Sequence, residues 1–340
     1  MNPPPRIVCV GAHIESEIVL RGLIEAEVNI VAVVTLPAGY SQGISDYCDL
    51  HELCYRHGLS VLDTGDINGE PTTEAIRATA PDYLFVAGWN RLFRPPTLAI
   101  PRCFVVGSHP SPLPEGRGRA PIPWTILLNK TESAATLFRM TANADEGPIL
   151  LQSKFDIPPG SVAFDVYQRA AVALRDSFVT LYRQLQAGAV PEQPQIASEA
   201  SYYAKRTPLD GRLDFTHAAE ELDRVVRAVA YPYPGAYTYY NGAVVRFWAT
   251  DLLASTPNYA AAPGQILEVV EGRCLVMTGD RPLWITHLTS DDPLLDPATL
   301  RAGARFGYRI EDSIHSLSRA LSQLSARVTE LEGQSFNAEA

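Results

Sequence analysis

Short apolar runs alternate with amphipathic segments through the first third of the chain, and no other feature limits the fold as strongly. The runs Arg6–Gly11, Asn29–Leu36 and Tyr83–Ala87 predict buried strands, and the segments between them predict helices. Strands that alternate with helices form a mainly parallel sheet covered on both faces. Such sheets bind ligands at the carboxyl ends of their strands. The sequence therefore predicts an α/β, Rossmann-like domain with its functional site at that edge.

The rest of the chain divides by composition and periodicity. We expect residues 1–189 to form the first domain, which ends with an amphipathic helix from Phe164 to Leu185. The segment 190–201 is rich in Pro, Gln, Ser and Ala, which is typical of a linker. Short strand-like pieces separated by turn residues in 202–309 predict a small β-rich, barrel-like domain. The 340 residues are thus expected to form two domains and a tail.

The tail, residues 310–332, repeats apolar side chains with a strict four-three spacing. This pattern predicts a coiled-coil-like helix. Two packings fit it, one against its own domain and one against a partner helix, and the narrow two-position stripe favours the partner. We therefore expect a homodimer, with this helix as the candidate contact. The seam consists of Ile310, Ile314, Leu317, Leu321, Leu324, Val328 and Leu331.

Net charge and cysteine usage exclude several classes of protein. The formal net charge of -10 at pH 7 lacks the basic footprint with which proteins hold long nucleic acids. The five cysteines are scattered and odd in number, which suits a reducing cytoplasm and argues against a disulfide framework. No apolar run approaches the length of about 18 residues that spans a membrane, and the N-terminus has no signal-peptide core. The sequence predicts a cytoplasmic protein with a small-molecule ligand.

One His and one Asp follow apolar strands and are candidates for proton transfer. His109 precedes Pro110, which holds it extended, and Asp145 precedes Glu146 and Gly147. A carboxylate beside an imidazole raises the pKa of the imidazole and orients the ring, so such a pair acts as a general acid or base. The G-x-S-x-G nucleophile elbow is absent. Direct transfer to an external nucleophile is therefore favoured over a covalent enzyme intermediate.

Three other patterns carry less weight. The first turn, GAHIES, lacks the G-x-G-x-x-G spacing of a dinucleotide site. A set of Cys and His side chains recurs at steps of three residues, and each step turns a helix by about 300°, so the set cannot converge on one ion. Its members are Cys48, His51, Cys54 and His57, and we expect no metal site. Arg117 and Arg119 lie between glycines, where an anion clamp and a solvated loop are equally good interpretations.

Three segments together resemble the folate-dependent formyltransferase family: HPSPLPEGRGRAPIPWTILLNK, LFRMTANADEGPIL and RAVAYPYPGAYT. Their order matches the family, and so does the separation of 36 residues between His109 and Asp145. The resemblance covers residues 6–310 and is closest to enzymes that N-formylate nucleotide-linked amino sugars. Methionyl-tRNA formyltransferases are near relatives, but they hold a large polyanion, for which this acidic chain has no evident surface. A tRNA enzyme predicts strongly salt-dependent RNA binding.

The resemblance implies a role for individual residues. His109 matches the catalytic His that shuttles the proton of an attacking amine, and Asp145 matches the Asp that tunes and orients it. The implied donor is 10-formyltetrahydrofolate, the implied acceptor is a primary amine on a small metabolite, and no metal takes part. The positions that match folate-contacting segments of the family are Arg91, Leu92, Phe93, Arg119, Thr141, Ala142, Asn143, Ala144 and Asp145.

One position departs from the family pattern. The family places Asn two residues before the His, where its amide donates to the oxyanion, and this chain has Gly107. Loss of one oxyanion donor typically lowers the rate by roughly 10²–10³. A backbone N–H, Ser108 or a water could replace the amide, the acceptor could be more reactive, or the protein could be a weak or altered catalyst. Two alternatives follow: a formyltetrahydrofolate hydrolase, and a non-catalytic folate-binding protein.

Overall fold

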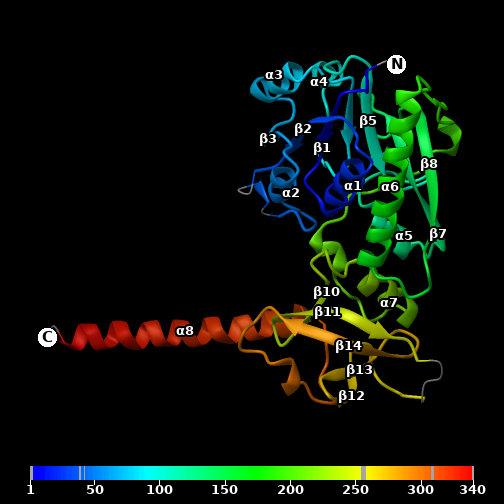
Figure 1. The fold of residues 1–340 in the computed structure, drawn as a ribbon. Coiled ribbons are helices and arrows are strands. Elements are labelled where there is room, and N and C mark those ends of the chain that lie inside the picture. The colour runs from blue at the N-terminus through cyan, green and yellow to red at the C-terminus, as the bar shows by residue number, and fades with distance from the viewer. Residues whose placement is uncertain (1–2, 38–39, 42, 254–257, 308–309, 339–340) are drawn as a thin grey trace. The chain divides into compact units, whose positions relative to one another are not determined.

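The computed structural model describes residues 3–37, 40–41, 43–253, 258–307 and 310–338 (Figure 1). The chain forms two compact units, of which the first holds Met1–Asp210 and Arg227–Gly235. The second holds Gly211–Val226 and Ala236–Ala340. This division differs from the predicted one, because the expected linker 190–201 and residues 202–210 belong to the first unit. Backbone pairing explains the difference, since this segment forms hydrogen bonds with loops of the first unit.

A seven-stranded sheet with the order β3-β2-β1-β4-β5-β7-β8 forms the centre of the first unit. Its parallel strands are β1 (Ile7–Val10), β2 (Ile30–Thr35), β3 (Val61–Asp63), β4 (Tyr83–Val86) and β5 (Phe104–His109). Two antiparallel strands complete it, β7 (Glu132–Arg139) and β8 (Ile149–Asp156). The predicted α/β fold with a mainly parallel sheet is confirmed.

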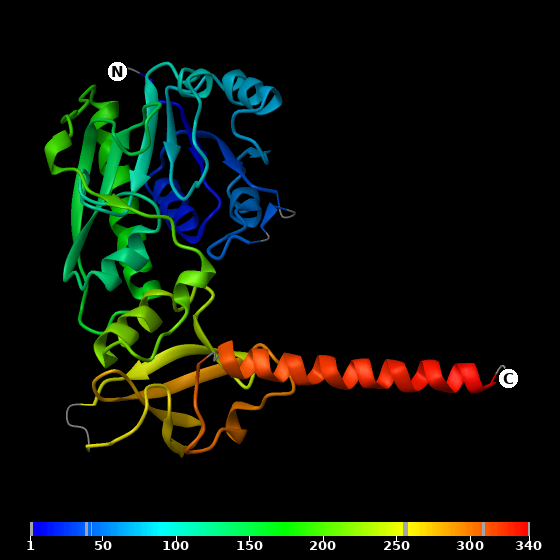
Figure 2. The ribbon, with the colours of Figure 1, turned by 180° about the vertical axis from the view of Figure 1, so that it is seen from behind.

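Side chains that alternate along each strand build a separate apolar core on each face of the sheet. One core joins residues such as Phe85 and Val106 to α1 (Ile14–Glu25), α2 (His51–Arg56) and α6 (Ala163–Gln186). The other core joins Val86 and Val105 to α3 (Glu70–Ala78) and α4 (Pro95–Leu98). Figure 1 shows α1 and α6 side by side on the near face, and Figure 2 shows the sheet from behind. Neighbouring residues of β5 therefore face different cores.

Three short elements around the sheet were missed by the sequence analysis. Strand β6 (Arg117–Gly118) pairs in parallel with β9 (Tyr202–Tyr203), and two residues are too few to show a period. Helix α5 (Pro121–Leu127) was hidden in a Pro-rich loop. Proline is tolerated in the first turn of a helix because the N–H that it lacks has no intrahelical partner there. These elements all lie in or beside the segment that carries His109.

The second unit is built on a five-stranded antiparallel sheet with the order β10-β11-β14-β13-β12. Phe247 contacts Phe215 and Phe306 in its core, with ring centroids 6.2 Å and 5.2 Å apart. The predicted β-rich domain is confirmed, although the sequence analysis missed β10, which follows a Pro- and Gly-rich turn. The strands are β10 (Ala236–Tyr240), β11 (Ala243–Asp251), β12 (Ile266–Val270), β13 (Arg273–Met277) and β14 (Pro282–Ser290), preceded by α7 (Ala219–Ala228).

The tail forms α8 (Ile310–Ala338), a helix of 29 residues drawn in red in Figure 1. It continues past the predicted end at residue 332. Seam residues whose side chains are described remain exposed, from 52% for Val328 to 69% for Leu321. The side chains of Ile310 and Leu331 lie outside the described residues. Among the helices of the described ranges, none combines the length and hydropathy of a membrane span.

Candidate catalytic site

His109 is the last residue of β5, and only 6% of it is exposed. The loop that follows it is fastened to the neighbouring strands. The hydroxyl of Thr136 on β7 donates to the carbonyl oxygen of Ser111 over 2.6 Å. The side-chain amide of Gln152 on β8 donates to the carbonyl oxygen of Leu113 over 3.0 Å. Because the sheet holds the loop at both points, the imidazole sits on a rigid support.

The two ring nitrogens of His109 face different partners. Nε2 lies 2.8 Å from the carbonyl oxygen of Gly116. A carbonyl oxygen only accepts hydrogen bonds, so Nε2 carries the proton in the neutral ring. Nδ1 faces Asp145, with 4.0 Å between Nδ1 and Oδ1. Nδ1 is then the nitrogen that can accept a proton, and the nearby carboxylate stabilises the imidazolium that forms.

Asp145 reaches His109 by a different route from the expected one. We expected both residues at the carboxyl ends of parallel strands, but β7 is antiparallel to β5. The end of β7 therefore lies beside Val106, in the middle of β5. Residues 140–148 then fold back, and Asp145 adopts a left-handed backbone conformation with φ of 58°. The N–H of Gly118 donates to its Oδ2 over 2.9 Å. The returning loop, not a shared edge, brings the pair together.

Gly107 has no room for a side chain in this structure. A Cβ built on it would lie 2.8 Å from Cζ of Phe138 and 2.8 Å from Cγ of Met140. Real Cβ atoms essentially never show contacts under 3.0 Å. The place of the family's Asn side chain is thus filled by apolar atoms. Restoring the amide would require these two neighbours to move.

Ser108 is a poor substitute for that amide. Val105 and Val106 lie in different cores, so consecutive side chains of β5 point to opposite faces of the sheet. Ser108 follows the alternation of Val106, whereas His109 shares its face with Val105. The Ser108 hydroxyl is therefore directed away from the His109 side. Of the replacements considered from the sequence, a backbone N–H and a water remain.

The segment after β4 supplies groups that fit a flat heteroaromatic ligand. Leu92 is a large apolar side chain with 68% exposure, and Phe93 beside it is buried. The guanidinium of Arg91 lies 5.9 Å from the ring centroid of Tyr40 and 6.0 Å from that of Trp89. The Nε1 of Trp89 is buried without a hydrogen-bond partner among the described residues. An unpaired donor beside exposed apolar surface suits a ligand with ring-edge acceptors, such as a pterin.

The other positions expected to contact folate lie at the surface. Thr141, Ala142, Asn143 and Ala144 are exposed and lead into Asp145. The Thr141 hydroxyl donates to the carbonyl oxygen of Asn143, and the Asn143 amide donates to Oε2 of Glu146. The loop tip thus holds its own shape next to the His109–Asp145 pair.

The two arginines of the motif have different surroundings. Arg119 is exposed, and its backbone N–H donates to the carbonyl oxygen of Tyr203 over 3.0 Å. Arg117 is only 5% exposed, and its guanidinium donates to Gln195. Gln195 is a site residue that the sequence analysis missed, because the composition of its segment indicated a linker. A buried Arg requires acceptors, which is a signal that no sequence pattern locates.

A buried polar cluster lies where β1 and β4 end. His13 Nδ1 is 3.5 Å from Asp46 Oδ2, to which the Tyr167 hydroxyl also donates over 3.1 Å. Burial and the charge of Asp46 raise the pKa of Glu15 to about 7. Burial lowers the pKa of His13. Glu15 interacts with the Gly88 backbone, and Gly88 follows the strand that pairs with β5. The cluster therefore presents acidic groups toward the edge that carries His109.

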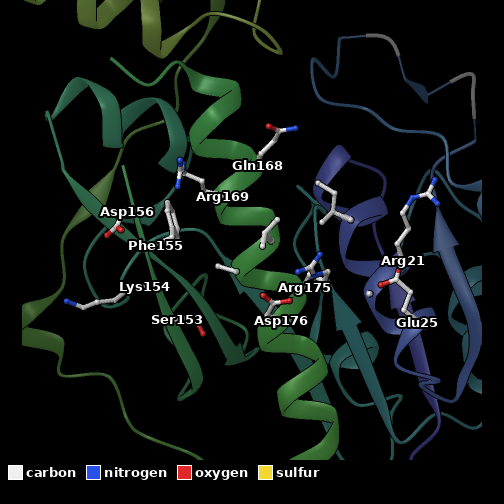
Figure 3. A pocket seen from close by; sticks show the side chains of 14 residues that line it. Arg21, Glu25, Ser153, Lys154, Phe155, Asp156, Gln168, Arg169, Arg175 and Asp176 are labelled. Atoms are coloured by element: carbon white, nitrogen blue, oxygen red, sulfur yellow. Dashed lines mark hydrogen bonds and ion pairs between the residues drawn. The ribbon is translucent and has the colours of Figure 1, made fainter. Parts of the chain in front are cut away.

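Two groups of polar side chains away from the His109 edge form ion pairs of their own. Both ring nitrogens of His51 face carboxylates, Asp49 at 2.6 Å and Asp63 at 2.8 Å. In the described ranges, no group of three or more His, Cys, Asp or Glu residues is arranged to hold a metal ion. Figure 3 shows a groove between α1, α6 and β8, where the Arg175 Nε and Asp176 Oδ1 atoms are 2.8 Å apart. This groove lies on the face opposite to His109.

Two family models match the chain. One, described as "Formyl transferase", matches residues 21–180, and the other, described as "Formyl transferase, C-terminal domain", matches residues 205–300. The first covers strands β2 to β8 with His109 and Asp145, and the second covers most of the β-rich unit. Together they account for most of the chain in the order that the family has.

Solved structures show the same fold at low sequence identity. HypX from Aquifex aeolicus in complex with tetrahydrofolic acid is 17% identical, with a TM-score of 0.64 over 85% of this chain and 45% of HypX. This chain therefore spans less than half the length of HypX. An N-formyltransferase from Helicobacter canadensis in complex with folinic acid and dTDP-3-aminofucose is 16% identical. Its TM-score is 0.60 over 83% of this chain and 99% of that enzyme. The methionyl-tRNA formyltransferase from Clostridium thermocellum is 16% identical, with a TM-score of 0.55 over 73% of this chain and 94% of that enzyme.

Proposed function

The chain belongs to the formyl transferase family, and from this premise we propose that it moves a formyl group from 10-formyltetrahydrofolate to a primary amine of a small metabolite. One observation carries the proposal. The proton-accepting Nδ1 of His109 faces Asp145 at 4.0 Å. Strands β7 and β8 fix the loop that follows His109 through hydrogen bonds from Thr136 and Gln152. Proton transfer from an attacking amine needs a base of this kind.

The proposed reaction moves one formyl group and one proton. The amine nitrogen forms a bond to the formyl carbon, and His109 takes the proton that the amine loses. The bond from that carbon to the folate nitrogen then breaks, and His109 returns the proton to this nitrogen. Tetrahydrofolate and the N-formyl product leave. The Gly116 carbonyl oxygen holds the ring through Nε2, and the Asp145 carboxylate stabilises the charged form of the ring between the two transfers.

The donor assignment draws on chemistry and on similarity. Arg91, Leu92 and the unpaired Trp89 Nε1 suit a flat ring with hydrogen-bonding edges. Two of the similar structures hold tetrahydrofolic acid or folinic acid. We assign the donor site to this segment and to residues 141–145. Removal of the indole donor should weaken folate binding and leave the His109–Asp145 pair intact.

For the acceptor, a nucleotide-linked amino sugar is our first choice. A similar enzyme was solved with dTDP-3-aminofucose. The net charge of -10 argues against tRNA as the acceptor.

We also propose that two copies associate in the cytoplasm through α8. In its seam, the first core positions of the heptad are Ile314, Leu321 and Val328, and the second ones are Ile310, Leu317, Leu324 and Leu331. Two of the three first positions are β-branched and three of the four second positions are Leu, a pattern that favours a parallel two-stranded coiled coil. The exposure of the described seam side chains in a single chain, 52% or more, supports a partner helix.

The test is release of tetrahydrofolate from 10-formyltetrahydrofolate by the purified protein, with and without a panel of nucleotide-linked amino sugars and amino acids. Release that requires both an amine and His109 supports the transferase. Release at the same rate without an amine identifies a hydrolase instead. Folate binding without release with any acceptor contradicts a catalytic role, as the closed Gly107 position would then predict.

A further inference from the structure

The segment expected to be a linker runs along the catalytic loops. Gln193 exchanges two backbone hydrogen bonds with Ile149, each of 2.8 Å, just after the Asp145 loop. Ser201 accepts from the backbone N–H of Gly116 through its hydroxyl and from that of Arg117 through its carbonyl oxygen, both over 2.9 Å. The segment can be followed in yellow-green in Figure 2. It is therefore bound to both loops that form the site.

Gln195 connects these loops through a single side chain. Its Nε2 donates to the carbonyl oxygen of Asp145 over 2.8 Å and to that of Gly147 over 2.7 Å. Its Oε1 accepts from Nε and Nη2 of Arg117 over 3.1 Å and 2.8 Å. Both donors and both lone pairs of the amide are thus used. An amide satisfied in this way has one orientation.

Arg117 completes the connection from the other side. It is the first residue of β6, and its neighbour Gly118 donates to the carboxylate of Asp145. Its Nη1 lies 3.4 Å from Oε1 of Glu146 and 3.2 Å from the hydroxyl of Tyr202. Because the guanidinium is 5% exposed, these acceptors replace water around a charge. Strand β6 consequently binds the carboxylate of Asp145 through Gly118, and through Arg117 it orients the Gln195 amide that binds the backbone of Asp145.

The hydrogen bonds from Gln195 stabilise a strained backbone conformation at Asp145. Asp145 has φ of 58°, in the left-handed region that non-glycine residues adopt at a cost. Gln195 binds the carbonyl oxygen of Asp145 itself and that of Gly147, two residues later in the same turn. Without the amide, the turn loses the bonds that offset its strain. A shift of about 1 Å in a catalytic group can lower the rate by about 10²-fold.

We propose that Gln195, braced by Arg117, is a positioning residue that sets the distance between the carboxylate of Asp145 and Nδ1 of His109. The proposal rests on the proposed formyl transfer for its kinetic readout, and it adds a residue from segment 190–201 to the site. Gln195 touches no reacting atom. It acts through Asp145 alone.

The test compares Gln195→Met with Gln193→Met. Methionine has a similar length to glutamine but offers neither strong donors nor strong acceptors. Gln193 is exposed and pairs through its backbone, so it serves as the matched control. We expect Gln195→Met to lower kcat by about 10–100-fold, with the Kd of folinic acid within about 3-fold of wild type. Gln195→Glu, which keeps the acceptors for Arg117 but loses the donors, should fail equally.

A double-mutant cycle separates positioning from a general structural role. In an Asp145→Asn background, Gln195→Met should cause no further loss of kcat, because the residue through which it acts is already disabled. Losses that multiply would overturn the proposal. So would a Gln195→Met protein with wild-type kcat.

A spectroscopic readout keeps this test independent of the proposed reaction. With ¹⁵N-labelled histidines, Gln195→Met and Asp145→Asn should both move the ring ¹⁵N signals of His109, and Gln193→Met should not. If wild type transfers no formyl group but these signals move, the proposed function fails and the positioning role stands. Unmoved His109 signals in Gln195→Met overturn the positioning role whatever the activity.

Discussion

The loops around His109 and the helix α8 differ in which groups they leave without a partner. In the loops, polar groups are bonded one to another, as in the connection from Arg117 through Gln195 to Asp145. On α8, apolar side chains line one stripe and stay more than half exposed, among them Leu317 and Leu321 at 69%. The first region is complete within one chain. The second has an apolar surface that a single chain does not cover.

This difference determines which measurement responds to a substitution in each region. Hydrogen bonds are directional, so an error in the loops changes a distance and should appear as a rate. Apolar burial is non-directional and scales with area, so an error on α8 should appear as an association constant. Gly107 lies between these cases, because an apolar contact occupies a place where the family uses a polar one.

The largest expected effect is the loss of catalysis in His109→Ala. Removal of the proton-accepting Nδ1 that faces Asp145 should lower kcat by roughly 10²–10⁴. The Kd of folinic acid should stay close to wild type, since residues 91–93 and 141–145 of the proposed donor site are unchanged in this variant. Stopped-flow or steady-state release of tetrahydrofolate measures the first quantity and isothermal titration the second. His57→Ala, which removes an exposed histidine, is the control; an unchanged kcat in His109→Ala would break the comparison.

Leu321→Asp should weaken self-association, because it places a charge in the exposed apolar stripe of α8. Each helix loses about 1.5–3 kcal/mol of leucine burial, so the dimer loses about 3–6 kcal/mol and its dissociation constant rises by roughly 10²–10⁴. Analytical ultracentrifugation measures the constant. Gln323→Asp introduces the same charge on the same helix, away from the seam, and should leave the dimer intact. A monomeric wild type would remove the reason for the exposed stripe.

Gly107→Asn tests the position where the family has an Asn amide and this chain has contacts with apolar side chains. The new side chain collides with Phe138 and Met140, and overpacking of this kind costs about 1–3 kcal/mol. We expect a lower Tm and no gain in kcat. Gly188→Asn is the matched control, because Gly188 ends α6 at a φ of 80° with open space around it, and Asn tolerates that conformation. A faster and equally stable Gly107→Asn enzyme would show that the pocket can open for the amide.

The fold was largely predictable because its signals are local and repeated. The apolar runs at Tyr83–Ala87 and Asn29–Leu36 gave strands, and the three-four spacing along 164–185 gave α6. The missed elements have no local period. β6 and β9 consist of two residues each, and they exist only because distant segments pair. The antiparallel direction of β7 was also not evident, since direction depends on how a loop returns and not on the strand itself.

The site was predictable where one residue type carries the chemistry. His109 and Asp145 were identified from type and context, although Asp145 reaches its partner by an unexpected loop. Gln195 was not found, because an amide becomes part of a site only through where its segment lies. The closure of Gly107 was equally hidden, since nothing in the sequence marks Phe138 of β7 or Met140 just after it as its neighbours. Sequence patterns located the reactive groups, and tertiary contacts determine what positions them.

The smallest expected effect concerns the acidic cluster beside the site, and it depends on pH. Glu15 has an ordinary pKa near 4.5, and burial with the nearby charge of Asp46 raises its pKa in the folded protein to about 7. Tyr167 and Tyr233 pack nearby with raised pKa values, and the pKa of His13 is lowered, so no cation in this group offsets the carboxylates. The folded state thus binds a proton at Glu15 more tightly than the unfolded state does.

The sign of the effect follows from this proton. Stability contributed by neutral Glu15 is fully present below about pH 4.5 and is lost as pH rises through about 7, because the folded protein must then bury a charge. Glu15→Gln mimics the neutral acid, so it should match wild type at pH 5 and raise the Tm by a few degrees at pH 8. Glu74→Gln, at an exposed glutamate of α3, controls for net charge. An equal shift of Tm at both pH values would show that the pKa of Glu15 is not raised in the folded protein.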